Sequence, residues 1–138
     1  MRTCWIVLVV AICCCIGCSN PFDKGFGWTE IRSLSVDPAT VHAGELVEIR
    51  AVVVDHSHGD EDIAFPLVYA LSVSAGELFA TRADAETRIS NPGSAPGARQ
   101  ITVIGRTGWW IAPNTPQSAI VRVAIGDVER SIKVEVLP

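Results

Sequence analysis

The sequence predicts an all-β fold: a single β-sandwich of about seven strands, preceded by a signal peptide. Three observations support this prediction. Apolar and polar residues alternate in several short segments, turn residues interrupt them every 8–12 residues or so, and no segment has the 3.6-residue apolar period of an amphipathic helix. A chain of 138 residues has room for one domain and its leader.

The first eighteen residues have the features of an export signal. Arg2 gives a short, positively charged start, and Trp5–Ile16 is an apolar segment of twelve residues. The apolar part of a signal peptide has about 7–15 residues, whereas a membrane-spanning helix needs about 20. We therefore expect residues 1–17 to be a signal peptide. All five cysteines lie at or before Cys18, so we expect no disulfide and no thiolate site in the folded part.

The end of the apolar segment, Cys15-Ile16-Gly17-Cys18, resembles the lipobox of bacterial lipoproteins, although Cys15 stands where Leu is usual. The resemblance implies cleavage after Gly17, a diacylglyceryl thioether on Cys18 and further acylation, for example with palmitate. Two or three acyl chains suffice for stable membrane anchoring. Ser19 in place of Asp resembles the class sorted to the outer membrane or cell surface in Gram-negative bacteria. An uncleaved anchor and an ordinary signal peptide cut nearby are the alternatives.

Residues 18–30 are expected to form the lipidated cysteine and a tether to a domain at 31–138. Pro and Gly residues interrupt the tether, which shows no regular apolar period. It is rich in aromatic residues, and we expect these to pack on the domain or to lie at the lipid interface. Docking of a partner through Trp28 is the alternative. The aromatic residues are Phe22, Phe26 and Trp28.

From residue 31 onward the chain has the alternating pattern of half-buried strands. Val47 and Ile49, for example, share one face of a strand, and Glu48 and Arg50 share the other. Gly126-Asp127 predicts a tight hairpin between the last two strands. The expected strands are 32–36, 45–55, 63–73, 77–80, 99–104, 118–125 and 128–137. We expect the polar residues 81–98, with their two Pro-Gly turns, to form one long loop.

Two segments of the domain carry a family resemblance. The stretch 34–45, Leu-Ser-Val-Asp-Pro-Ala-Thr-Val-His-Ala-Gly-Glu, and the stretch 110–113, Trp-Ile-Ala-Pro, resemble the opening and closing motifs of bacterial immunoglobulin-like (PKD-like) surface domains. Tyr69 and Leu71 stand where the third strand of such domains often carries Trp. The resemblance implies an immunoglobulin-like sandwich with an adhesive, spacer-like or substrate-presenting role, in which Trp110 packs inward.

The loop 55–62 is the first candidate binding site. It carries four carboxylates and two histidines in eight residues. Oxygen-rich loops can hold Ca²⁺, and two histidines with a carboxylate can hold Zn²⁺. The spacing does not follow the EF-hand order, and a solvated loop without metal is the main alternative. The candidate ligands are Asp55, His56, His58, Asp60 and Asp62.

Trp109 is the second candidate. Neighbouring strand residues point to opposite faces, so an inward Trp110 places Trp109 outward. An exposed Trp can stack on a glycan or anchor a protein partner. Cover by a loop or by the aromatic tether is the alternative.

Several classes of function are disfavoured by the sequence. It contains no nucleophile elbow, no His-Glu-x-x-His pair and no phosphate-binding loop, so we expect no enzyme activity and no cofactor except the Ca²⁺ considered above. The arginines are scattered, which disfavours nucleic acid as a partner. Three hypotheses remain: a non-catalytic lipid-anchored structural or interaction module of the cell envelope, a metal- or glycan-binding accessory domain, and a small subunit of an envelope complex.

Overall fold

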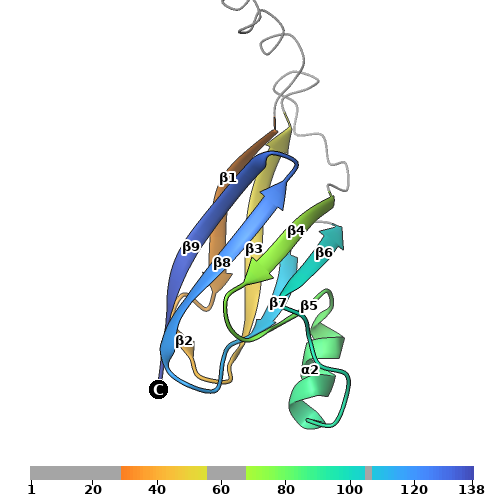
Figure 1. Cartoon of the computed structure of the whole chain (residues 1–138), viewed down its shortest axis with the longest axis vertical. Coiled ribbons are helices and arrows are strands. Elements are labelled where there is room, and N and C mark those ends of the chain that lie inside the picture. Colours follow the sequence, from red (N-terminus) through yellow and green to blue (C-terminus); the bar gives the residue numbers. More distant parts are fainter. Residues whose placement is uncertain (1–28, 56–67, 105–106) are drawn as a thin grey trace, which may run out of the picture.

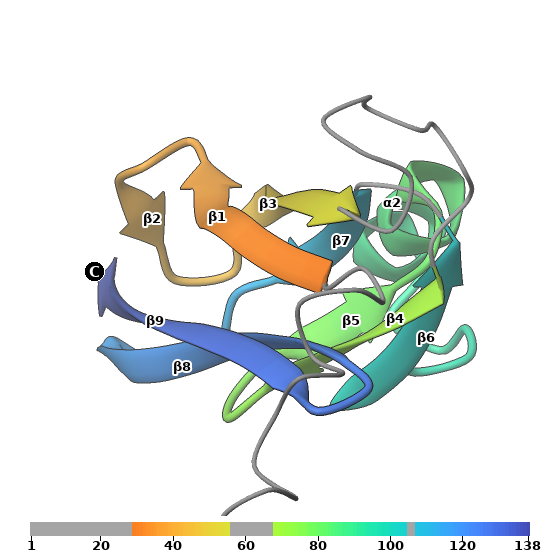
Figure 2. The same ribbon diagram turned by 90° about the horizontal axis from the view of Figure 1, so that it is seen from above.

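The computed structural model describes residues 29–55, 68–104 and 107–138. Within these ranges the chain forms nine strands and one short helix, and the strands build two sheets packed face to face (Figures 1 and 2). The predicted β-sandwich is confirmed at this level. The strands are β1 (Thr29–Asp37), β2 (Val41–His42), β3 (Leu46–Asp55), β4 (Val68–Val73), β5 (Glu77–Phe79), β6 (Gln100–Ile104), β7 (Thr107–Ile111), β8 (Gln117–Ile125) and β9 (Val128–Leu137).

The first sheet has four strands in the order β1-β3-β7-β5, and the second has five in the order β2-β9-β8-β4-β6. The short β2 runs parallel to β9, and the other pairs are antiparallel. The predicted hairpin joins β8 to β9, where Ile125 pairs with Val128 and Gly126 has a φ of 54°. A positive φ is the reason that a glycine stands at this turn.

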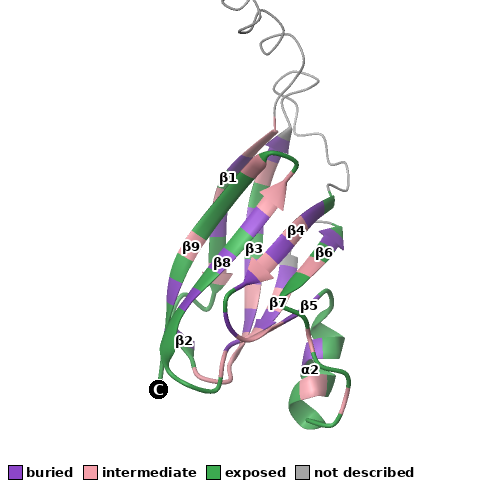
Figure 3. Ribbon diagram, viewed as in Figure 1, coloured by how far each residue is buried: buried purple, intermediate pink, exposed green. Residues whose placement is uncertain are grey.

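The hydrophobic core lies between the two sheets and follows the alternation seen in the sequence (Figure 3). In β8, Ala119, Val121 and Val123 are fully buried, whereas their neighbours Ile120 and Arg122 are exposed. Opposite faces of one strand therefore meet different environments. Among the described residues, no charged side chain is buried.

The prediction of a continuous loop over 81–98 is wrong, because its first half forms the helix α2 (Arg82–Ser90). Only Ala85 of this helix is buried, so it has no apolar face that periodicity could detect. Its N-terminus is specified by a cap: the Thr81 hydroxyl accepts a hydrogen bond from the Asp84 N–H at 3.2 Å and donates to the Asp84 carboxylate at 2.7 Å. The Thr-x-x-Asp spacing was the available signal.

The count of about seven strands was low, because β2 has only two residues and the segment that forms β7 was not among the expected strands. Gly108 lies inside β7 and is buried. A Cβ atom at this position would collide with Cδ1 of Leu71 on the facing sheet. The glycine therefore permits close packing of the two sheets and does not end the strand.

The sandwich has two ends that differ in what they carry (Figure 1). At the first, which we call the tether end, β1 begins at Thr29, and Thr29 pairs with Asp55 at the end of β3. β4 begins and β6 ends toward the same end, and their terminal residues there, Val68 and Ile104, pair with each other. At the other, the helix end, lie α2, β2 and the C-terminal residue.

Candidate functional site

The candidate site lies at the helix end and is built against β7. Trp110 points inward, as the resemblance implied, and is fully buried. Its indole N–H donates to the carbonyl of Ala75 at 2.9 Å. Gly76, with a φ of 84°, follows this carbonyl, and a Cβ there would collide with the backbone of Ile111 and the indole nitrogen of Trp110. The glycine allows the turn before β5 to close over the indole.

Trp109 points to the opposite face of the sheet and is partly buried. The guanidinium of Arg82, in the first turn of α2, lies over its ring, 5.4 Å from the ring centroid. The Nε of Arg82 also donates to Glu86 at 2.6 Å, one turn further along the helix. Within the described residues, the cover over Trp109 is therefore a polar helix, where a loop was expected; the aromatic tether lies outside the described residues. Part of the ring remains accessible to solvent.

A second arginine joins α2 to the sheet. Arg88 makes a bidentate ion pair with Glu77 of β5, with Nε–Oε2 and Nη2–Oε1 distances of 3.1 and 3.2 Å. Its Nη1 donates to the carbonyls of Pro92 and Ser94. The side chains of Arg88 and Glu77 are 23% and 29% exposed, so solvent screens their attraction only in part. One guanidinium thus holds the helix, the following loop and β5 together.

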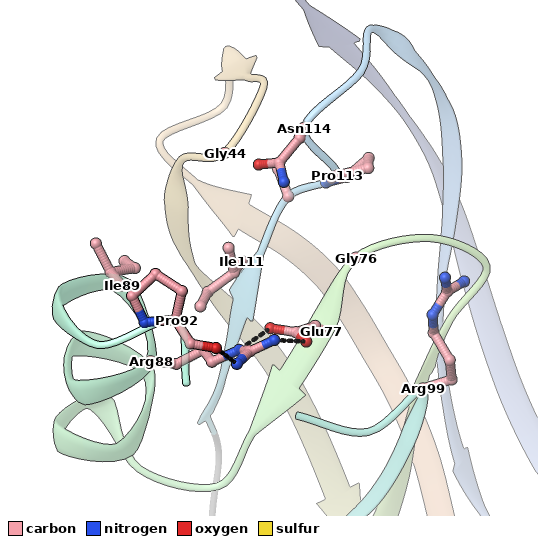
Figure 4. A pocket seen from close by; sticks show the side chains of 11 residues that line it. Gly44, Gly76, Glu77, Arg88, Ile89, Pro92, Arg99, Ile111, Pro113 and Asn114 are labelled. Carbon is pink, nitrogen blue, oxygen red and sulfur yellow. Dashed lines mark hydrogen bonds and ion pairs between the residues drawn. The ribbon is translucent and has the colours of Figure 1, made fainter. Parts of the chain in front are cut away.

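A cleft of about 450 Å³ lies beside this ion pair (Figure 4). Its apolar walls come from α2, the loop after it and the segment after β7. Its polar lining includes Arg99, whose Nη1 donates to the carbonyl of Ser74, and the exposed carboxamide of Asn114. Gly44, with a φ of 76°, brings the turn before β3 close to this carboxamide. The apolar lining includes Ile89, Pro92, Ile111 and Pro113.

The chemistry of the cleft suits recognition. Arg88 makes four hydrogen bonds within the protein and has five N–H donors, so little of it is left for a ligand. Arg99 has no carboxylate partner among the described residues, and it can donate to a carboxylate or carbonyl oxygen. Asn114 can both donate and accept. Together with apolar walls, these groups suit a polypeptide ligand.

The sequence analysis did not identify the residues of this cleft. These residues come from β5 (Glu77), α2 (Arg88), the residue directly before β6 (Arg99) and the turn after β7 (Asn114). No spacing along the chain links them, because the sheet pairings bring them together. The Thr-x-x-Asp cap before α2 was the signal that could have led to Arg88.

One polar group in the core is unusual. Tyr69, the single tyrosine of the chain, is buried within the sandwich, and its hydroxyl has no hydrogen-bond partner among the described residues. Burial raises the pKa of Tyr69 to about 12, because the low-dielectric interior disfavours the phenolate. On the surface, hydrogen bonds from Lys133 and Ser118 lower the pKa of Glu135.

Most predicted site residues lie outside the described residues: Cys18, Trp28, His56, His58, Asp60 and Asp62. Asp55 is described only as the last residue of β3. Over 29–55, 68–104 and 107–138, no group of three or more His, Cys, Asp and Glu could hold a metal ion. In the same ranges no helix is long and apolar enough to cross a membrane. Lipidation of Cys18 and metal binding by the loop 55–62 stay predictions.

Comparison with known proteins assigns no family to this chain. No protein-family model matches it, and no curated protein matches it. Among solved structures it is similar to a conjugative transposon lipoprotein from Bacteroides eggerthii DSM 20697, with a TM-score of 0.40 and 12% identity over 80% of this chain and 95% of that one. A similarity of this degree supports no inference about function.

Proposed function

We propose that this protein is a lipid-anchored, non-catalytic immunoglobulin-like module of a bacterial cell envelope, which binds a protein partner through its helix end. One observation carries the proposal: β1 begins at one end of the sandwich and α2 lies at the other (Figure 1), where residues of α2 line the cleft (Figure 4). A lipid on Cys18 would hold the tether end at the membrane. The cleft would then face away from the membrane, where a partner can reach it.

The length of the tether supports this arrangement. Cys18 precedes Thr29 by eleven residues. An extended chain of that length spans at most roughly 36–40 Å, so the domain would stay within that distance of the lipid surface. Two or three acyl chains would make the attachment stable, and restriction to a surface would raise the local concentration around a partner in the same membrane.

The strand order supports the immunoglobulin-like part of the proposal. The sheet β1-β3-β7-β5 follows the A-B-E-D order of such sandwiches, and the neighbours β9-β8-β4 follow G-F-C. One connection departs from the usual order. After β4 the chain crosses to the other sheet to form β5 beside β7, and it then returns through α2 to place β6 beside β4. The helix end is thus the part in which this chain differs most from the common sandwich.

The anchor is tested by mass spectrometry of the protein purified from membranes of its native host. We expect an N-terminal peptide that begins at Cys18 and carries a diacylglyceryl group and a further acyl chain. The Cys18→Ser variant should lack these groups and leave the membrane fraction. An unmodified Cys18, or a peptide that still contains residues 15–17, would contradict the anchor.

Partner binding through the cleft is tested by cross-linking in the native host, comparing two matched variants. Asn114→Lys places a long cation at the cleft, whereas Gln117→Lys makes the same change at an exposed carboxamide that is not part of the cleft lining. We expect Asn114→Lys to reduce the yield of cross-linked partner at least fivefold and Gln117→Lys to leave it unchanged. Equal yields from the two variants would rule out the cleft as the binding site.

A further inference from the structure

We propose that the free edge of β6 binds an extended segment of a partner polypeptide, which adds a strand to the five-stranded sheet. This second site shares Arg99 with the cleft at the helix end and otherwise lies apart from it. It deepens the proposed function, on which it rests in one respect: the choice of a partner over a second copy of this chain depends on the lipid anchor.

The hydrogen bonds around the start of β6 show which backbone groups face the free edge. The Arg99 carbonyl accepts from Val73 of β4 at 2.9 Å, so residue 99 faces β4. Ala98 faces the opposite side, where it exchanges hydrogen bonds of 2.7 and 3.2 Å with Leu78 of β5. Successive strand residues direct their backbone groups to opposite edges. The residues in phase with Ala98 along β6, which are Gln100, Thr102 and Ile104, therefore direct N–H and C=O groups away from β4.

Beyond Ala98, no described strand pairs with this edge. Leu78 of β5 forms an isolated bridge with Ala98. The strand β5 itself belongs to the other sheet, where it pairs with β7. Six backbone groups of β6, three donors and three acceptors, therefore face outward along a strand whose pairing with β4 has no shift of register. An incoming strand would continue, along β6, the pairing that Leu78 begins.

The other sheet edges carry devices that discourage such pairing, among the residues described. β1 has a bulge between Ile31 and Ser33, and the Arg130 guanidinium donates to the carbonyls of Ile31 and Arg32 at 3.1 and 3.0 Å. β2 and β5 have two and three residues. The open part of β9 carries several charges, including Lys133. Short strands, bulges and charges are the means by which natural sheets protect their edges.

β6 has none of these devices. Its sequence, Gln-Ile-Thr-Val-Ile, contains no charge and no Pro, and the four residues after Gln are of types that favour strands. At its end, Ile104 is 72% exposed and pairs with Val68, which is 56% exposed. These are the two most exposed large apolar side chains among the residues described. A side chain of an added strand would lie next to Ile104 and cover this apolar pair.

The anchor argues against a second copy as the occupant. Two copies of β6 can meet edge to edge by a two-fold axis only as antiparallel strands. Since β6 runs along the molecule between the helix end and the tether end, this pairing would point the two tether ends in opposite directions (Figure 1). Two chains that stand upright on one membrane would then have to reach it from opposite ends, and residues 99–106 of a second copy contain no carboxylate that could meet Arg99. The occupant is therefore an extended segment of a different polypeptide.

The charge at β6 specifies the chemistry of that segment. Arg99 stands directly before β6, is exposed and has no carboxylate partner within the described ranges. A segment with an uncharged core of β-branched residues and a carboxylate at the end nearest Arg99 would match both features. Main-chain hydrogen bonds would supply affinity, and the carboxylate would supply orientation.

The test measures binding of synthetic peptides to the full-length lipidated chain in mild detergent. The probe is a seven-residue peptide of alternating Val and Thr with a Glu at each end, and the matched control has Lys in place of Glu. With saturating Glu peptide, we expect amide hydrogen exchange at Gln100, Thr102 and Ile104 to slow at least tenfold. The Lys peptide should bind at least threefold more weakly because of Arg99. No slowing at millimolar Glu peptide would overturn the proposal.

Two substitutions locate the binding edge. Thr102→Pro removes one outward N–H and leaves the bonds to β4 in place, so it should weaken binding at least tenfold, whereas Thr102→Val should change it less than twofold. If Thr102→Pro does not fold, Ile104→Glu replaces it, with Ile120→Glu on β8 as its matched control. We expect at least fivefold weaker binding for Ile104→Glu alone. Equal binding by test and control variants would overturn the proposal.

Two further results separate this site from the anchor. A concentration-dependent dimer in sedimentation that Thr102→Pro abolishes would show that a second copy is the occupant, which overturns the choice of a partner segment. The mass of the Cys18 peptide is measured on the same preparation. An unlipidated Cys18 together with peptide binding at β6 would overturn the anchor and support the site itself.

Discussion

The two neighbouring tryptophans of β7 meet opposite environments. Trp110 is fully buried and donates to a backbone carbonyl, and Gly76 lets the turn before β5 approach its indole closely. Trp109 is covered in part by the Arg82 side chain of a helix that buries one residue, Ala85. The first environment is made by shape and apolar burial. The second is made by charges and caps at the surface.

This difference suggests that the two regions respond separately to disturbance. Apolar burial is worth roughly 25 cal/mol per Å² and dominates the free energy of unfolding, whereas surface ion pairs and caps contribute about 1 kcal/mol or less each. Loss of an interaction that holds α2 should therefore open the helix and its cleft and leave the sandwich folded. Loss of a core contact should destabilise the whole domain.

The largest expected effect is at Trp110. Trp110→Ala removes the largest buried side chain and leaves the Ala75 carbonyl without its donor, so the free energy of unfolding should fall by about 3–5 kcal/mol. Trp109→Ala is the matched control and should lower it by less than half as much. Urea denaturation followed by circular dichroism measures both. Equal losses would remove the distinction between the two regions.

The second expected effect concerns Tyr69 at high pH. Its pKa is near 10 in an unfolded chain and about 12 in the folded protein, so stability from the neutral phenol is fully present below pH 10 and is lost as pH rises toward 12. This difference of two units in pKa corresponds to about 2–3 kcal/mol in the free energy of unfolding. The difference between wild type and Tyr69→Phe in urea denaturation at pH 8 and pH 11.5 isolates this contribution.

Absorbance of the phenolate gives an independent check, because Tyr69 is the single tyrosine of the chain. The midpoint of its titration in the folded protein should lie near 12. A midpoint near 10 would mean that solvent or a hydrogen-bond partner reaches the hydroxyl. At neutral pH, Tyr69→Phe should be neutral or stabilising, because the buried hydroxyl has no partner among the described residues.

The third prediction tests the ion pair that holds α2. Arg88→Lys keeps the charge and loses the bidentate fork to Glu77 and the two carbonyl contacts. Hydrogen exchange of the α2 amides should accelerate about 5- to 30-fold, which corresponds to about 1–2 kcal/mol, since hydrogen bonds to charged groups contribute about that much. Exchange at core positions such as Val121 should not change. Arg122→Lys, at an exposed pair with a 4.0 Å separation, is the matched control.

The smallest expected effect is the coupling between Arg82 and Trp109. A double-mutant cycle with Arg82→Gln and Trp109→Leu should give a coupling of about 0.5–1 kcal/mol, typical of an exposed cation–π pair. The readout is again the free energy of opening of α2 from hydrogen exchange. A coupling of zero would show that the ring is covered without being attracted to the arginine.

Much of the fold could be predicted because its signals are local. The alternation in β3 and β8 and the hairpin at Gly126-Asp127 follow from residues adjacent in the chain, whereas the inward position of Trp110 was implied by the family resemblance. Side chains alternate between faces with a period of two, so a local pattern identifies the buried face without knowledge of the partner strand. The same reasoning missed α2, because a helix with one buried residue has no apolar period.

The candidate sites were not predictable in this way. The cleft joins Arg99 and Asn114 with residues of α2, and the open edge of β6 exists only because β5 pairs with Ala98 and then joins the other sheet. Both depend on which strands become neighbours. That choice is made by contacts between residues far apart in the chain, and no spacing in the sequence records it.

The sequence by itself determined that this chain has a β-sandwich with a core between alternating strands, because apolar period and turn chemistry act over a few residues. The tertiary structure alone decided that Trp109 lies under a polar helix, that Arg99 lines a cleft and that β6 has an open edge. The physical reason is that the apolar pattern of each strand specifies which of its faces is buried. Which strands become neighbours, and which strand edges stay exposed, is decided only when the two sheets pack.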